Sequence, residues 1–254
     1  MTTVKQSVNQ QFSNVAANYR TSRGHSDGHD LQQFTTLIGE LASPQVLDLG
    51  CGAGHATMAV APVSASVVAY DLSEAMLEQV MLLAAERGVQ NVTTQQGDVE
   101  KLPFEDNSFD AVVTRVSAHH WPNPMAALHE ACRVLRPNGK LLVQDIVAPE
   151  SPGEDSFVQT FEILRDKSHV RDHSISQWLA MLSTAGFTSR VVEAWRWDIV
   201  FEKWVTRMNT PAANVAMIRT LFDEAPREYR ETFLIQDNHD FKFHAVLLEA
   251  TVSK

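Results

Sequence analysis

The sequence predicts an α/β fold, a doubly wound and mostly parallel sheet with helices on both faces. Between residues 44 and 147, short apolar runs alternate with longer stretches of helical periodicity, and the first apolar run ends in a glycine-rich turn. Strands joined by helical crossovers favour a parallel sheet. The length of 254 residues suits one large domain or a domain with a cap.

Five apolar runs in this region are typical of buried or half-buried strands. The first run ends at glycine, whereas the second ends at an aspartate and the fourth at an arginine. The predicted strands are residues 46–50, 66–71, 91–96, 109–115 and 140–147.

Helix end signals lie between these strands. Ser73 suits the N-cap of a helix that ends at Gly88, which suits its C-terminal cap. Pro124 suits the first turn of a second helix, which runs to about Leu135 and is ended by residues 136–139.

The flanking regions differ from this core. The first 43 residues are polar and helical in pattern, and Phe12 and Tyr19 share one helix face. Beyond Pro149 the pattern predicts helices near 157–164 and 176–185, a strand near 189–201, a helical stretch over 202–229 and a final strand over 241–249. The stretch 202–229 interrupts two strands, so we expect it near one end of the sheet, where it could cover a pocket.

The charge of the chain argues against a polyanionic partner. There are 21 Lys and Arg residues against 31 Asp and Glu residues, and the basic residues are scattered. A net charge of −10 repels nucleic acid on average, so we expect no nucleic-acid partner. No apolar run approaches the length of about 20 residues that a membrane span needs, and the polar N-terminus favours a cytoplasmic location.

Cysteine and histidine spacing predicts no metal site. Cys51 and Cys132 are too few for a disulfide framework or a zinc-ligand set. His25, Asp27 and His29 lie in a polar loop, where such side chains are usually solvated. The remaining histidines of the C-terminal half lie far apart and form no ligand pattern: His169, His173, His239 and His244.

The most informative motif follows the first predicted strand, where Gly50, Gly52 and Gly54 alternate with small residues. Glycines at a strand-to-helix turn let the backbone approach a ligand closely, and the N-terminus of the next helix favours negative charge. A glycine-rich turn by itself also fits a tight turn without a ligand.

Two further strand ends point to an adenosine-containing ligand. Asp71 ends the second strand, where a carboxylate can accept hydrogen bonds from both ribose hydroxyls. Asp98 and Val99 follow the third strand, where a carboxylate can accept from an exocyclic amine while a backbone N–H donates to a ring nitrogen. Carboxyl ends of parallel strands share one sheet edge, so these groups are expected to converge.

Dinucleotide binding is the first competing interpretation, and the spacing disfavours it. The turn is Gly-x-Gly-x-Gly rather than Gly-x-Gly-x-x-Gly. Asp48 precedes it, and a carboxylate suits a sulfonium or ammonium group better than a pyrophosphate.

The order of these motifs closely resembles the class I S-adenosylmethionine-dependent methyltransferases, above all the branch typified by ubiquinone/menaquinone-biosynthesis C-methyltransferases and their bacterial relatives. The resemblance covers about residues 10–150. Its motifs are Leu-Asp-Leu-Gly-Cys-Gly-Ala-Gly from Leu47, Asp71, Gly97-Asp98, Leu102-Pro-Phe, Asn107-Ser-Phe-Asp and Arg133-Val-Leu-Arg-Pro-Asn-Gly.

The resemblance implies a seven-stranded Rossmann-like sheet, with six strands parallel and the last antiparallel. It further implies a division into residues 1–43 as an N-terminal helical lid, 44–150 as the S-adenosylmethionine-binding core, and 151–254 as the completion of the sheet with helical insertions over the substrate.

The resemblance also implies residue roles. The three glycines would flank the methionine moiety, Asp71 the ribose, and Asp98 and Val99 the adenine. The other implied positions are Leu72 and Met76 near the ribose or adenine, the carbonyl of Arg115 near the cofactor's amino group, and Tyr19 as a lid tyrosine near its carboxylate. Core packing for Met76, a surface ion pair for the Arg115 side chain and helix packing for Tyr19 remain open alternatives.

His119 and His120 follow the fourth strand, where acceptor and methyl group are expected to meet. One imidazole could remove a proton from the acceptor, and His120 is preferred because Trp121-Pro122 fixes its exit from the loop. Both histidines could instead shape the pocket or cap the loop, since many methyl transfers need only alignment.

We therefore predict methyl transfer from S-adenosylmethionine to a small, apolar or aromatic acceptor, with S-adenosylhomocysteine as product. The alternatives are another enzyme class on the same cofactor and a non-catalytic cofactor-binding or scaffold protein; an NAD-dependent oxidoreductase is disfavoured by the glycine spacing. The acceptor, the methylated atom and the oligomeric state are left open.

Overall fold

A computed structural model describes residues 2–20 and 28–252, and the side chains of residues 17–20 lie outside that description. The strands form one seven-stranded sheet in the order β3-β2-β1-β4-β5-β7-β6. Their bounds are β1 Gln45–Leu49, β2 Ser66–Asp71, β3 Val92–Gln96, β4 Phe109–Arg115, β5 Leu135–Val147, β6 Phe187–Ile199 and β7 Phe241–Val252. The last strand, β7, runs antiparallel to both of its neighbours, β5 and β6, while the pairs among β1 to β5 are parallel. The predicted fold class and strand directions are thus confirmed.

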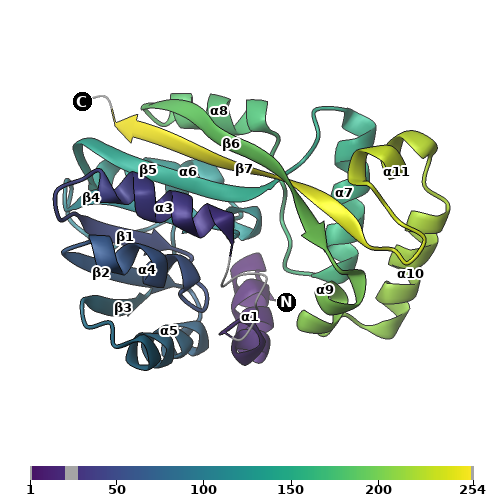
Figure 1. Ribbon diagram of the computed structural model, residues 1–254, viewed down its shortest axis with the longest axis horizontal. Helices are drawn as coiled ribbons and strands as arrows, with labels where there is room; N and C mark the ends of the chain where they lie inside the picture. The colour runs from purple at the N-terminus through teal and green to yellow at the C-terminus, as the bar shows by residue number, and fades with distance from the viewer. Residues whose placement is uncertain (1, 21–27, 253–254) are drawn as a thin grey trace.

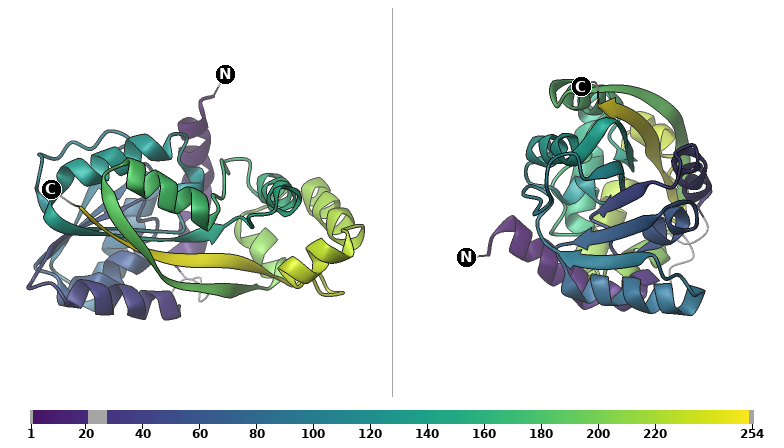
Figure 2. Two further views of the ribbon diagram at one scale, coloured as in Figure 1. Left: turned by 90° about the horizontal axis from the view of Figure 1, so that it is seen from above. Right: turned by 90° about the vertical axis from the view of Figure 1, so that its left-hand side faces the viewer.

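Helices cover both faces of the sheet (Figures 1 and 2). Their bounds are α1 Val4–Arg20, α3 His29–Gly39, α4 His55–Val60, α5 Glu74–Arg87, α6 Pro124–Val134, α7 Pro152–Arg165, α8 Ile175–Thr184, α9 Phe201–Arg207, α10 Ala212–Asp223 and α11 Arg227–Phe233, with single 3-10 turns η1 at Ala61–Val63 and η2 at Ala118–His120. None of the helices in the described ranges combines the length and apolarity that a bilayer crossing requires.

Side-chain alternation in the strands divides the core into two layers. Val46 of β1 packs with α3, α4 and α5 on one face, whereas Leu47 packs with α6 and α8 on the other. Successive residues of a strand point to opposite faces, so an apolar run serves both layers at once. The loops that follow the parallel strands lie at the edge of the sheet between these two layers.

A third core lies beyond the end of the parallel strands. Helices α7, α9, α10 and α11 surround the extended parts of β5, β6 and β7, at the right of Figure 1. Its centre is aromatic: Phe161 is fully buried, with the rings of Phe222 and Phe241 at 5.2 and 5.4 Å. This packing gives the C-terminal third its own hydrophobic centre.

Several predicted boundaries differ from the structure, and two of them have a clear physical reason. Strand β5 begins at Leu135 rather than 140, because Leu135 pairs with Phe109 of β4, and regular pairing resumes at Lys140 after a shift in the register. The helical stretch 202–229 is three helices, since Pro211 and Pro226 adopt extended backbone angles and each begins a new helix.

Candidate active site

A pocket lies at the carboxyl edge of the parallel strands, between the ends of β1, β2 and β4, the turn after β3, and α1. Its open space, mouth included, is about 1020 Å³. In Figure 1 the helix α1 lies beside these strand ends. The position is where open α/β sheets bind ligands.

The turn after β1 forms the floor of this pocket. Gly50 has a φ of 64° and its N–H donates to the carbonyl oxygen of Tyr70 at 2.8 Å. A Cβ there would meet Ser117 Oγ at 1.9 Å, so the close approach requires glycine. At Gly52, with a φ of 51°, a Cβ would meet no atom within 4 Å. The backbone at Gly52 therefore borders open space that a ligand can fill.

Asp71 braces this turn at the end of β2. Its Oδ2 accepts from the N–H of Gly52 at 2.9 Å and its Oδ1 from the N–H of Ser73 at 2.8 Å. Burial raises the pKa of Asp71, partly offset by these hydrogen bonds. A carboxylate has about four acceptor positions, so each oxygen keeps capacity for a ligand hydroxyl.

Asp98 and Val99 line the pocket in the turn after β3, next to Leu72 and Met76. The Asp98 carboxylate lies 2.6 Å from Lys5 Nζ, a residue of α1. This ion pair joins the first turn of α1 to the end of the pocket where the sequence places the adenine.

Asp48 is fully buried beneath the glycine turn and lines the pocket. Thr57 Oγ1 donates to its Oδ2 at 2.6 Å, while its Oδ1 has no hydrogen-bond partner. Burial raises the pKa of Asp48 to about 7, against the effect of the Thr57 hydrogen bond. A buried carboxylate oxygen without a partner is poised for a cationic or donor group of a ligand.

The sequence-predicted binding residues are thus brought together with two exceptions. Gly54 does not line the pocket: with a φ of 88° it begins α4 and packs against Val80. The side chain of Tyr19 lies outside the described residues. The predicted residues that line the pocket are Asp48, Gly50, Gly52, Asp71, Leu72, Met76, Asp98, Val99 and Arg115.

The side chain of Arg115 corrects one interpretation. Its Nε donates to Asp30 of α3 in an ion pair whose two side chains are each 5% exposed, so a surface ion pair is wrong. The next residue, Val116, has a φ of 51°, which is unfavourable for a β-branched side chain. Its N–H donates to the Gln144 carbonyl at 2.8 Å. The surrounding structure therefore holds a strained turn at the pocket wall.

The two adjacent histidines occupy different surroundings. His120 lines the pocket, whereas His119 does not. The Nδ1 of His119 lies 2.7 Å from Asp145 Oδ1, and the two side chains are 8% and 2% exposed. The Nδ1 of His120 lies 3.1 Å from the Ser168 carbonyl oxygen. Of these two adjacent histidines, His120 is thus the one in a position to touch a ligand in this pocket.

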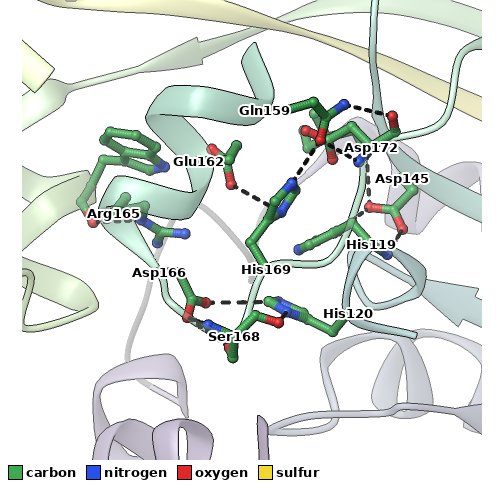
Figure 3. A network of polar contacts seen from close by, with 12 residues as sticks. His119, His120, Asp145, Gln159, Glu162, Arg165, Asp166, Ser168, His169 and Asp172 are labelled. Carbon is green, nitrogen blue, oxygen red and sulfur yellow. Dashed lines mark hydrogen bonds and ion pairs between the residues drawn. The ribbon is translucent and has the colours of Figure 1, made fainter. Parts of the chain in front are cut away.

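Behind His120 lies a group that we call the histidine–carboxylate cluster (Figure 3). It comprises His119, His120, Asp145, Glu162, Asp166, His169 and Asp172. The ring centres of His119 and His120 are 4.2 Å apart, and those of His119 and His169 are 5.8 Å apart. His169 Nε2 also lies 2.8 Å from Gln159 Oε1 of α7. His169 therefore packs beside His119 although the two residues lie far apart in the sequence.

Charge is distributed unevenly within this cluster. Burial would lower the pKa of His119, but the Asp145 carboxylate outweighs it and raises that pKa to about 9. Burial, and next the charge of His119, lower the pKa of His120 to about 4 and that of His169 to about 2. Burial raises the pKa of Asp172 well above its ordinary value. At pH 7 the cluster thus holds one imidazolium, on His119, beside two neutral imidazoles.

Sequence reasoning missed several residues of the site. Lys5, Phe12 and Trp121 line the pocket, and Asp145 and Asp166 belong to the cluster. Phe12 carried a signal, since it lies on the apolar face of α1, but no motif links Asp166 to His120. The tryptophans of the C-terminal third do not line the pocket; Trp178 and Trp204 are buried core residues. Within residues 2–20 and 28–252, no three His, Cys, Asp or Glu side chains are arranged to hold a metal ion.

Comparisons with known proteins agree with this geometry. The family model described as Methyltransferase domain matches residues 47–143. The chain is 37% identical to the uncharacterized methyltransferase YcgJ of Bacillus subtilis over 94% of this chain and 96% of that protein. It is 31% identical to the ubiquinone/menaquinone biosynthesis C-methyltransferase UbiE of Ectopseudomonas mendocina, over 84% and 87%. The crystal structure of Bacillus YcgJ superposes with a TM-score of 0.85 at 36% identity, covering 89% of this chain and all of that one.

Proposed function

Since this chain belongs to the S-adenosylmethionine-dependent methyltransferases, we propose that its pocket aligns a small, apolar or aromatic acceptor with the cofactor's methyl group. The observation that carries this proposal is the convergence of three strand ends on one pocket whose lining includes aromatic side chains. Phe12 and Trp121 line this pocket, together with Pro122. The similarity to a C-methyltransferase of ubiquinone and menaquinone biosynthesis supports an acceptor with an aromatic ring.

The residues of the pocket suit the cofactor one group at a time. Asp71 would accept from the ribose hydroxyls, because its two oxygens retain acceptor capacity beside their backbone donors. Asp98 and the N–H of Val99 would hold the adenine edge. The unpartnered Oδ1 of Asp48 would face the cationic methionine end of the cofactor. The open space at Gly52 would receive part of the methionine moiety.

The bound cofactor supplies an electrophilic methyl carbon on a sulfonium. The chain contributes alignment and exclusion of water, which supply much of the rate for a displacement of this kind. Helix α1 closes the pocket through Lys5, Val8 and Phe12, and the Lys5–Asp98 pair holds it there. A nucleic-acid acceptor is not part of the proposal because the net charge of −10 opposes one.

Calorimetric titration with S-adenosylmethionine, S-adenosylhomocysteine and NAD tests the cofactor assignment, and a panel of phenols and hydroquinones with radiolabelled cofactor tests the acceptor class. We expect micromolar binding of the two sulfur ligands, none of NAD, and label transfer to members of the panel. Transfer to peptides or RNA but to none of the phenols or hydroquinones would contradict the acceptor class. Cofactor binding without transfer to any of these acceptors would favour a cofactor-binding scaffold.

A further inference from the structure

The imidazole of His120 is held by the segment that follows α7. A carbonyl oxygen only accepts hydrogen bonds, so the 3.1 Å contact requires that His120 Nδ1 carries the proton and donates it to Ser168. The neutral ring then has its lone pair on Nε2. The described residues provide no hydrogen bond to Nε2, whose neighbour Asp166 Oδ2 is 3.9 Å away.

Asp166 is itself arranged to face this ring. Its Oδ1 accepts from the N–H of Ser168 at 2.8 Å and from its Oγ at 2.6 Å, which fixes the carboxylate. Its Oδ2 is buried without a hydrogen-bond partner and points to His120 (Figure 3). The segment of residues 166–168 therefore both sets the tautomer of His120 and places a carboxylate oxygen 3.9 Å from Nε2. The negative charge of that carboxylate would stabilise the positive charge that a proton arriving on Nε2 gives the ring.

The rest of the cluster keeps His120 neutral before the reaction. His119 is the imidazolium, paired with Asp145, and its ring centre lies 4.2 Å from that of His120. A second positive charge on His120, so close to the imidazolium of His119, is therefore unfavourable. His120 thus presents a base, and His119 does not, because its Nδ1 is committed to Asp145.

Resting on the proposed methyl transfer, we propose that His120 is the general base that deprotonates the acceptor, and that Asp166 and the Ser168 carbonyl are its positioning groups. The acceptor is then one whose nucleophilic atom, or a hydroxyl conjugated with it, carries a proton at neutral pH. His119 belongs to the electrostatic surroundings of His120 and does not touch the acceptor.

The step balances as follows. The lone pair on Nε2 forms the new N–H bond, and the O–H bonding pair stays with the acceptor. A pair from the acceptor forms the bond to the methyl carbon, while the bond from that carbon to sulfur breaks with its pair on sulfur. The Nε2–H of the His120 imidazolium points at the acceptor atom from which the proton came, and the Asp166 carboxylate, 3.9 Å away, stabilises the positive charge of the ring until water removes the proton after product release.

Ring ¹⁵N NMR of the S-adenosylhomocysteine complex tests the positioning, with His120→Gln to assign the signals. We expect a neutral Nδ1–H tautomer for His120 at pH 7. Asp166→Asn removes the charge that favours the imidazolium and is expected to lower the pKa of His120 further. Asp198→Asn is the matched control, since this carboxylate is exposed and pairs with Lys242. An Nε2–H tautomer, or a pKa that Asp166→Asn leaves unchanged, overturns the proposal.

Kinetics on substituted phenols of graded acidity test the catalytic role. We expect His120→Gln to lower kcat by about 10²- to 10⁴-fold on weakly acidic phenols, and Asp166→Asn by about 10- to 100-fold. Both losses should shrink on phenols already ionised at the assay pH, with cofactor affinity unchanged. Equal losses on all phenols mean a structural role and overturn the assignment. If wild-type protein binds the cofactor but methylates no phenol, the acceptor class of the proposed function fails; the NMR result still decides the tautomer and the Asp166 contact.

Discussion

The cofactor pocket and the histidine–carboxylate cluster adjoin at His120 but are built in opposite ways. The pocket leaves groups open toward its interior, such as Oδ1 of Asp48 and the backbone at Gly52. The cluster also contains buried atoms without a hydrogen-bond partner, among them Asp166 Oδ2 and both carboxylate oxygens of Asp172. Apart from His120, however, no member of the cluster lines the pocket, and His119 lies 2.7 Å from Asp145. The open groups of the pocket are therefore available to a ligand, whereas the charges of the cluster act on one another inside the protein.

This difference separates the expected effects of mutation. Substitutions in the pocket should weaken cofactor binding and leave the fold intact, because the pocket groups that lack a partner in the protein would find one in the ligand. Changes in the cluster should alter folding free energy or proton affinity, because a buried charge loses its partner within the protein.

The largest effect is expected for Asp145→Asn. This change leaves the buried His119 without its counter-charge, so the free energy of unfolding at pH 7 should fall by about 3–5 kcal/mol. Urea denaturation measures it. In the double variant with His119→Gln, part of the loss should return because no unpaired charge remains. Without that recovery, the pair would not be the source of the stability.

A loss of cofactor binding is expected for Asp71→Ala. Removing the acceptor for the ribose hydroxyls should weaken S-adenosylmethionine binding by about 1–3 kcal/mol, the scale of hydrogen bonds to a charged group. Calorimetry measures it, with Asp198→Ala as control because that side chain is 79% exposed and does not line the pocket. Unchanged affinity in a folded variant would sink the ribose assignment.

The adjacent histidines should show opposite pH dependences of stability. The pKa of His119 rises from 6.5 to about 9 on folding, so its stabilisation is complete below pH 6.5 and lost as pH rises through 9. The pKa of His120 falls from 6.5 to about 4, so its neutral form favours folding above pH 6.5, and stability is lost as pH falls toward 4. Melting curves from pH 4 to 9 for wild type, His119→Gln and His120→Gln check both signs. Dependences of the same sign would remove the contrast.

The smallest effect on stability is expected for Gly52→Ala, and it has a matched partner in Gly88→Ala. Both glycines have positive φ, 51° and 66°, and at both a Cβ meets no atom within 4 Å. Each change should cost about 1–2 kcal/mol of stability through backbone strain. Only Gly52→Ala should also weaken S-adenosylmethionine binding, since Gly88 ends α5 away from the pocket. Equal affinities would show that the open space at Gly52 is not used by the cofactor.

Contiguous motifs made much of the pocket predictable. The strand-end positions of Asp71 and Asp98 follow from strand length and parallel connection, and the structure brings both to one pocket. The seven-stranded sheet with β7 antiparallel was likewise expected. The start of β5 was not, because the irregular pairing of residues 135–139 depends on the partner strand β4.

The fold class and the edge of the sheet where the pocket lies could be predicted from the sequence, because each depends on residues close together in the chain or on the regular geometry of parallel strands, and the order of the motifs then indicated the cofactor. Which of two adjacent histidines faces the pocket, and what charge each carries, depends instead on tertiary contacts. The groups that decide it, Asp145, Asp166 and Ser168, lie 25 to 49 positions further along the chain from His119 and His120. Their effect arises from burial and short-range electrostatics, which no local pattern in the sequence encodes.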